Sequence, residues 1–229
     1  MLKHLAIIPD GNRRWAKKNK VSLKRGYVQG IERMGDLLKW CREENIRMLT
    51  IWGFSMENFA RTKNEVRSLF GLFSQRLDEA LKEDEYHKNR VRVRFFGRRD
   101  QFPKHIQQKI AELEEQTAHY NRFYLNLFFG YGGRVEIVDA CQAIVDKARQ
   151  GTVKKVTETM FASQLYTTGM PDPDLIIRTS NETRLSGFLP WQGAYSELYF
   201  SKKLWPDFTR RDLKAALRDY ARRQRRYGR

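Results

Sequence analysis

Short apolar runs alternate with longer amphipathic stretches along this chain. The short runs are typical of buried strands, and the stretches repeat apolar residues every three or four positions, as helices do. Strands are expected at residues 4–9, 47–54, 91–97, 123–129, 174–180 and 194–200. Helices are expected over 26–45, after a cap at Thr62, from Pro103 to about Tyr120, over 134–149 and from about Thr209 to Arg225.

This alternation predicts an α/β fold with a mostly parallel central sheet of about six strands flanked by helices. The chain shows no repeat, low-complexity linker or domain boundary, so one domain over 1–229 is expected. Ligands of such sheets bind at the carboxyl ends of the strands. Asp10, Ser55, Gly130 and Arg178 fall at those ends, so we expect them to gather at one site.

Composition narrows the class of protein. Hydrophobic residues make 41% of the 229, enough for a folded core. The longest apolar runs are too short for a membrane-spanning helix, and the N-terminus turns polar too soon for a secretory signal. Cys41 and Cys141 lie far apart without a CxxC partner, which favours reduced thiols in the cytoplasm. The four histidines lack the spacing of a zinc site.

The net charge of +17 is compatible with nucleic acid, an anionic membrane surface or phosphorylated substrates. No nucleic-acid-binding motif accompanies it. The basic stretch 202–229 reads either as a solvated helix face or as a binding surface.

The first group of candidate residues follows the first strand, in the run "DGNRRW". Asp10 can ligate Mg²⁺, and the turn at Gly11 and Asn12 can present backbone N–H groups to an anion. Arg13 and Arg14 can each bind phosphate oxygens with two N–H groups. An ordinary strand, turn and helix with a capping aspartate remains an equal alternative from this stretch alone.

The second group lies in 53–62, "GFSMENFART". Ser55, Glu57, Asn58 and Arg61 crowd the end of the second strand, just before a helix. They could form a capping box and nothing more. The first group beside them favours a polar ligand site.

The third group lies in 176–200. Arg178, Arg184 and Ser186 offer two guanidinium groups and a hydroxyl, a suitable clamp for a diphosphate. Glu197 lies in an aromatic-rich run, where a carboxylate needs a metal ion or an arginine as partner. A surface cluster of salt bridges is the alternative. The chain contains no GxGxxG, Walker loop, Ser-His-Asp set or DDxxD pair, so diphosphate chemistry with Mg²⁺ is the most economical interpretation.

These motifs resemble those of the cis-prenyltransferases, the undecaprenyl diphosphate synthase family. "DGNRRWAKK", "FSMENFAR", "NLFFGYGGR", "IRTSNETRLSGFLPWQ", "YSELYF" and "WPDF" occur in the family's order over essentially the whole chain. The resemblance implies one α/β domain with a hydrophobic tunnel, a homodimer or heterodimer, and Mg²⁺ as cofactor. It implies condensation of an allylic prenyl diphosphate with isopentenyl diphosphate to give a Z-polyprenyl diphosphate.

The resemblance also assigns roles to residues. It makes Asp10 the Mg²⁺-handling aspartate, Asn58 the proton acceptor and Glu197 a second metal ligand. The substrate-binding residues that it implies are Gly11, Asn12, Arg13, Arg14, Trp15, Tyr27, Ser55, Met56, Glu57, Phe59, Arg61, Arg178, Arg184, Leu185 and Ser186. Arg226 and Gly228 match an RxG element that reaches the other subunit's site.

Some positions depart from the family's pattern. Tyr27 stands where the family has histidine, Leu23 where it has arginine and Phe59 where it has tryptophan. Ser180-Asn181 replace a Gly-Gly pair, and Gly187 replaces asparagine. These changes leave the prenyl acceptor open. The alternatives are therefore a homologue that uses another acceptor, or a non-catalytic partner subunit, although the latter would be expected to have lost the run 10–14.

The last expectations concern the length of the product and the cellular location of the protein. Phe70 and Phe73 share a helix face, and 95–96 and 128–129 are Phe-Phe pairs at strand ends. If these rings close the end of the tunnel, the products are short or medium in length. The alternative is that the rings belong to the hydrophobic core alone. We expect a cytoplasmic protein, with association at the inner face of the membrane open, and no nucleic-acid partner.

Overall fold

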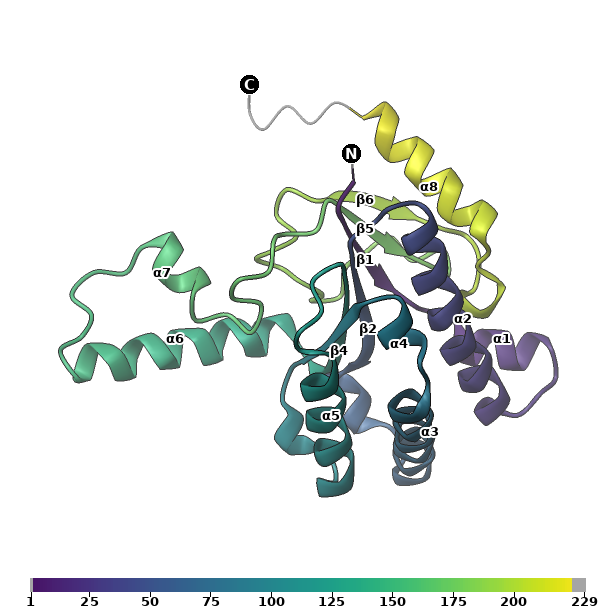
Figure 1. Cartoon of the computed structure of the whole chain (residues 1–229), viewed down its shortest axis with the longest axis horizontal. Helices are drawn as coiled ribbons and strands as arrows, with labels where there is room; N and C mark the ends of the chain where they lie inside the picture. Colours follow the sequence, from purple (N-terminus) through teal and green to yellow (C-terminus); the bar gives the residue numbers. More distant parts are fainter. Residues whose placement is uncertain (1, 224–229) are drawn as a thin grey trace.

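Six parallel strands form the central sheet (Figure 1). The computed structural model describes residues 2–223. The strands are β1 (His4–Ile8), β2 (Met48–Ser55), β3 (Val91–Phe96), β4 (Phe123–Tyr131), β5 (Leu175–Arg178) and β6 (Glu197–Phe200), in the order β3-β4-β2-β1-β5-β6. Every residue of β1 and β5 is buried, as expected of central strands that are covered on both faces.

Helices and loops divide the two faces of the sheet between them. The helices are α1 (Asn12–Lys18), α2 (Leu23–Glu43), α3 (Lys63–Lys82), α4 (Glu85–Lys88), α5 (Lys104–Thr117), α6 (Gly133–Arg149), α7 (Glu158–Ala162) and α8 (Arg210–Arg222). Side chains of α2, α3, α5 and α8 pack with Leu5, Ile7 and Ile51 in the larger core cluster. The other face carries a smaller cluster in which Ile8 and Phe128 meet Phe188 and Leu189 of the β5–β6 connection.

The predicted fold class is confirmed, and most element boundaries agree within a few residues. Helix α3 begins at the predicted cap, where the Thr62 hydroxyl accepts from the Glu65 N–H at 3.3 Å. The short helices α4 and α7 were not predicted, because neither is long enough to show a helical period. No helix within residues 2–223 has the length and hydrophobicity that crossing a bilayer requires.

Candidate active site

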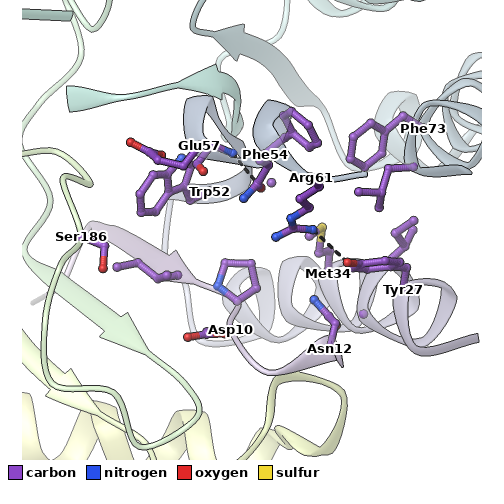
Figure 2. A pocket seen from close by; sticks show the side chains of 18 of the residues that line it. Asp10, Asn12, Tyr27, Met34, Trp52, Phe54, Glu57, Arg61, Phe73 and Ser186 are labelled. Atoms are coloured by element: carbon purple, nitrogen blue, oxygen red, sulfur yellow. Dashed lines mark hydrogen bonds between the residues drawn. The ribbon is translucent and has the colours of Figure 1, made fainter. Parts of the chain in front are cut away.

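A pocket of about 370 Å³ opens at the carboxyl ends of β1, β2 and β5, where the sequence placed the site (Figure 2). It is lined by Ile8, Pro9, Asp10, Asn12, Tyr27, Gly30, Ile31, Met34, Trp52, Gly53, Phe54, Ser55, Glu57, Asn58, Arg61, Leu69, Phe73, Arg178 and Ser186. Segments that are more than a hundred residues apart in sequence therefore meet in one cavity.

Hydrogen bonds to both the backbone N–H and the backbone carbonyl of Asp10 fix its position. Its N–H donates to the Thr179 hydroxyl at 2.8 Å, and its carbonyl accepts from that hydroxyl at 2.7 Å and from the Trp205 N–H at 2.9 Å. Next to it, Gly11 has φ 113°, and a Cβ there would lie 3.0 Å from Ser180 Oγ. The turn thus holds the carboxylate in one place by hydrogen bonds that do not involve its side chain.

Two arginines converge on the Asp10 carboxylate. Arg178, whose side chain is 6% exposed, donates to Oδ2 at 3.0 Å, and Arg14 approaches the same oxygen at 3.4 Å. Arg178 also donates to the Ser186 hydroxyl at 2.7 Å. Because both cations lie on Oδ2, the other oxygen, Oδ1, is the one left for a further ligand. This end of the pocket carries a compact cluster of opposite charges suited to a hydrated, charged group.

The backbone after Arg178 shows how Ser180 and Asn181 are accommodated where the family has Gly-Gly. Ser180 has φ 80° and Asn181 has φ 58°, so both adopt the left-handed conformation that glycine reaches most easily. Hydrogen bonds to residues after β6 hold them there, from Ser180 N–H to the Lys203 carbonyl and from Asn181 N–H to the Ser201 carbonyl. The loop therefore keeps a glycine-type shape without glycine.

Tyr27 and Arg61 form the opposite wall of the pocket. The Tyr27 hydroxyl donates to Glu65 Oε1 at 2.7 Å and accepts from Arg61 at 2.8 Å. Arg61 also pairs with Glu65 at 3.2 Å. Burial and then the hydrogen bond to Glu65 raise the pKa of Tyr27, so the phenol stays protonated at physiological pH. Figure 2 shows the Arg61 guanidinium between Tyr27 and the interior of the pocket.

Asn58 serves the backbone as well as the pocket. Its Oδ1 accepts from the Ser55 N–H at 3.1 Å, so the capping alternative for this segment is partly right. The amide Nδ2 is then the group free to reach a ligand. Glu57 is exposed and lies on the rim.

A second, apolar cavity adjoins the pocket, and Ile31, Met34 and Phe73 line both. Its volume is about 90 Å³, and it lies between the sheet and helices α2, α3 and α5. Phe95 and Phe129 line it too. This cavity is the candidate for the hydrophobic tunnel that the resemblance implied.

Two of the expected tunnel residues are elsewhere. Phe128 lies on the opposite face of the sheet, in the smaller core cluster, because neighbouring strand residues face opposite sides. Phe70 packs on Phe54, Phe59 and Phe102 instead of lining the cavity. The expectation that Phe70 and Phe128 floor the tunnel is therefore wrong.

Several other predicted residues lie beside the pocket instead of in its wall. Trp15 donates to Asp207 at 2.7 Å, Met56 packs on Gly132, and Phe59 belongs to the aromatic core. Leu185 packs against the smaller core cluster. None of these four side chains lines the pocket.

The exposed arginines are also outside the wall. Arg13 is exposed on α1, and Arg184 has a side chain that is 64% exposed and paired with Glu182.

Glu197 is not brought to Asp10 within one chain. It begins β6 level with Leu175 and hence with Leu5, at the opposite end of the strands from Asp10. Its carboxylate pairs with Arg223 at 2.7 Å, the arginine partner that the sequence allowed as an alternative to a metal. Arg226 and Gly228 lie outside the described residues.

Sequence reasoning missed most of the apolar wall. Trp52 lines the pocket and stacks on Phe188 with ring centroids 5.1 Å apart. Gly30 lets the Asn12 side chain approach, since a Cβ there would lie 2.3 Å from Oδ1. The only available signal was position, because Trp52 stands near a strand end and Gly30 on the helix after the first motif.

Comparison with known proteins identifies the family. A family model described as "Putative undecaprenyl diphosphate synthase" matches residues 8–228. The chain belongs to this family. An isoprenyl transferase of Thermotoga maritima is 47% identical over 225 residues, which are 98% of this chain and 96% of the relative. A tritrans,polycis-undecaprenyl-diphosphate synthase (geranylgeranyl-diphosphate specific) of Thermoplasma acidophilum is 44% identical, covering 99% of this chain and 89% of the relative.

Two solved structures share the fold. Lavandulyl diphosphate synthase from Lavandula x intermedia, in complex with dimethylallyl diphosphate, superposes with a TM-score of 0.95 at 34% identity, covering 100% of this chain and 98% of the other. A probable undecaprenyl diphosphate synthase from Campylobacter jejuni superposes with a TM-score of 0.82 at 35% identity, covering 100% and 99%. The protein is thus a prenyl-transferring enzyme of the prenyl diphosphate synthase type.

Proposed function

We propose that the enzyme is an Mg²⁺-dependent cis-prenyltransferase that joins an allylic prenyl diphosphate to isopentenyl diphosphate. The observation that carries this proposal is the junction of two cavities. A charged pocket with Asp10 between Arg178 and Arg14 adjoins an apolar cavity beside the sheet. A ligand with a diphosphate head and an isoprenoid tail matches both parts.

The donor set at Asp10 fits Mg²⁺. Magnesium prefers hard oxygen ligands and usually takes one or two carboxylates together with substrate phosphates and water. Asp10 offers Oδ1, while Oδ2 is held by the arginines. No cluster of three His, Cys, Asp or Glu side chains exists in the described chain, so the diphosphate itself would complete the coordination.

The reaction breaks the carbon–oxygen bond of the allylic diphosphate. The terminal carbon of isopentenyl diphosphate then bonds to the allylic carbon, a proton leaves the acceptor, and the new double bond is Z. Mg²⁺, when bound, supplies charge stabilisation for the departing diphosphate. Arg14 and the N–H groups after Asp10 assist at the same end, and the apolar cavity keeps water away from the cationic carbon.

The acceptor diphosphate is assigned to Arg178, Ser186 and Arg184. Arg178 and Ser186 are already hydrogen-bonded to each other in the pocket, and within residues 2–223 the mostly exposed Arg184 side chain pairs with Glu182. Moving Arg184 onto a phosphate therefore costs little. Tyr27 on α2 and Arg61, just before α3, face the same cavity, and Asn58 lines it too, near the proposed path of the proton. Its role as proton acceptor stays a prediction.

We propose short or medium products. An engineered protein cavity of about 150 Å³ binds benzene, and the apolar cavity here is smaller, about 90 Å³. Phe73, Phe95 and Phe129 enclose it, and Phe129 packs over Gly53, where a Cβ would lie 2.5 Å from the ring. The relatives' names cover different products, so family membership alone does not set the length.

A homodimer at the membrane surface completes the proposal. On α6, which projects from the body in Figure 1, Val138 and Val145 are 64% and 43% exposed and share a face with exposed Cys141. A second copy of the chain would cover this apolar stripe. The net charge of +17 and a hydrocarbon product favour a cytoplasmic enzyme at the anionic inner face of the membrane.

Replacing Asp10 tests the proposal. Asp10→Ala should lower turnover at saturating Mg²⁺ at least a thousandfold, because the loss of charge stabilisation removes several kcal/mol. Circular dichroism should show an unchanged fold. Asp84→Ala, which alters an exposed carboxylate paired only with Lys88, is the matched control. An Asp10→Ala enzyme that keeps a tenth of the wild-type rate would contradict the assignment.

A further inference from the structure

Arg76 on α3 lines two separate spaces. One is the apolar cavity of about 90 Å³. The other is a groove of about 470 Å³ on the outside, between α2 and α3, which Glu32, Gln75 and Glu79 also line. Ile31 and Gly35 of α2 line both spaces as well. These three residues are therefore the partition between the tunnel and the surface.

The partition is thin on the α2 side. A Cβ on Gly35 would meet nothing within 4 Å, so the helix leaves a gap at this position. Glycine within a helix costs up to about 1 kcal/mol relative to alanine, and here no close packing calls for it. Helix α3 also packs far more extensively against α5 than against α2. The seam between α2 and α3 is thus the weakly packed wall of the apolar cavity.

Ion pairs hold Arg76 in this seam. Its Nη1 lies 2.7 Å from Glu83 Oε1 and 3.0 Å from Glu79 Oε2, and its Nη2 donates to Glu83 Oε2 at 3.1 Å. The side chain is 36% exposed. Long basic side chains commonly place the aliphatic stem on apolar surface and the charged head in water. Arg76 has this arrangement available, because its guanidinium pairs with Glu79, which lines the groove, and the residue also lines the cavity.

We infer that Arg76 is a specificity-determining residue that closes the side of the tunnel and limits how far the isoprenoid tail can grow. This inference rests on the proposed function. A tail that outgrows the cavity would reach the groove through the α2–α3 seam beside Gly35. To pass, it would have to displace the Arg76 stem and separate a guanidinium from two carboxylates, which a hydrocarbon cannot replace as partners.

Product lengths test the inference. Arg76→Ala should lengthen the main product by one or more isoprene units, with the rate of the first condensation within about threefold of wild type. Glu83→Gln, which loosens the ion pair without changing a cavity-lining residue, should shift the distribution in the same direction by less. Arg67→Ala, an exposed arginine on the same helix that lines neither space, is the matched control and should leave the lengths unchanged.

A filled seam should reverse the effect. Gly35→Leu places a side chain in the gap, so Arg76→Ala/Gly35→Leu should return to wild-type product lengths. Unchanged lengths in both Arg76→Ala and Glu83→Gln, or an equal shift in Arg67→Ala, would overturn the inference. Normal condensation with unchanged lengths would leave the proposed function standing, so the two failures are distinguishable.

Binding supplies a readout that does not need turnover. Calorimetry with geranyl, farnesyl and geranylgeranyl diphosphate, in the absence of acceptor, should show affinity for wild type falling at least tenfold once the tail exceeds the cavity. Arg76→Ala should remove most of that fall, while its affinity for geranyl diphosphate stays within about twofold. Parallel affinity profiles in wild type and Arg76→Ala would overturn the inference even if the enzyme were inactive.

Discussion

At the scale of single residues, His4 starts a line of buried hydrogen bonds that crosses four strands. Its Nδ1 lies 2.8 Å from the Pro171 carbonyl and its Nε2 lies 2.8 Å from the Thr50 hydroxyl. Asn126 donates to that hydroxyl at 3.1 Å and accepts from Arg94 at 3.0 Å. Because a carbonyl only accepts, Nδ1 carries the proton, and a neutral ring accepts at Nε2 from the Thr50 hydroxyl. Burial away from water then requires a neutral imidazole.

This requirement predicts acid sensitivity. Burial lowers the pKa of His4 from 6.5 to about 4. The unfolded chain binds this proton at higher pH than the native one, so stability from His4 is full above about pH 6.5 and is lost as the pH falls to about 4. At ~1.4 kcal/mol per pKa unit, the loss is about 3 kcal/mol. Urea unfolding of wild type and His4→Asn between pH 4 and 7.5 measures it. The variant should be less stable overall but show a shallower pH dependence, and equal slopes would contradict the account.

Ser180 predicts a gain in stability. Its φ of 80° strains a residue with a Cβ, and its hydroxyl is buried without a hydrogen-bond partner in the described chain. Ser180→Gly should therefore raise the free energy of unfolding by about 1 kcal/mol and the melting temperature by about 2–4 °C. Asn181→Gly is the matched control and should gain less, because asparagine tolerates this conformation. A lower melting temperature for Ser180→Gly would refute the strain argument.

The sequence could predict the position of a site residue only where a nearby buried strand fixes that position. Asp10 and Arg178 were predictable, because each directly follows a buried strand and parallel strands end at one edge. The motifs did not indicate that Glu197 and Arg184 would pair with other residues outside the pocket wall. Their ionic partners, Arg223 and Glu182, depend on how loops and the last helix fold back, and no local pattern encodes that.

At the scale of elements, the alternation of side chains along a strand decides which face of the sheet each aromatic ring lies on. The sequence showed a Phe-Phe pair near the end of β4 but not which ring faces the helices. The structure turns Phe129 toward α3, where it meets Phe73 with ring centroids 4.6 Å apart, and Phe128 toward Phe96 on the other face. A register shift between Trp52 and Phe54 changes the alignment of β2 with β4 at this point. Only the assembled sheet reveals such a shift.

Because Phe128 and Phe129 lie on opposite faces of the sheet, one serves as the control for the other in a prediction about product length. Phe129→Ala should lengthen the products, because it enlarges the apolar cavity that Phe129 lines. Phe128→Ala removes an equally large, fully buried ring from the opposite face and should leave the products unchanged. Both should lose about 3–5 kcal/mol of stability. Chromatography of dephosphorylated products measures the lengths, and a shift in Phe128→Ala without one in Phe129→Ala would reverse our assignment.

At the scale of the whole molecule, the fold followed from a simple pattern. Near-continuous apolar strands separated by amphipathic helices allow few arrangements other than a covered parallel sheet. The pattern could not give cavity size. The distance between α2, α3 and the sheet depends on side-chain packing across elements, as at Gly35 and Arg76, and that distance limits the room for a prenyl chain.

The central claim is that this enzyme joins an allylic diphosphate to isopentenyl diphosphate with Mg²⁺. The most direct measurement incubates the purified protein with dimethylallyl, geranyl or farnesyl diphosphate and labelled isopentenyl diphosphate. Products are analysed by mass spectrometry and by NMR of the new double bond. We predict labelled Z-prenyl diphosphates well below eleven units, formed only with Mg²⁺ and absent with EDTA. Labelled isopentenyl diphosphate left unconsumed with every primer, or coupling of the allylic diphosphate alone, would contradict the account.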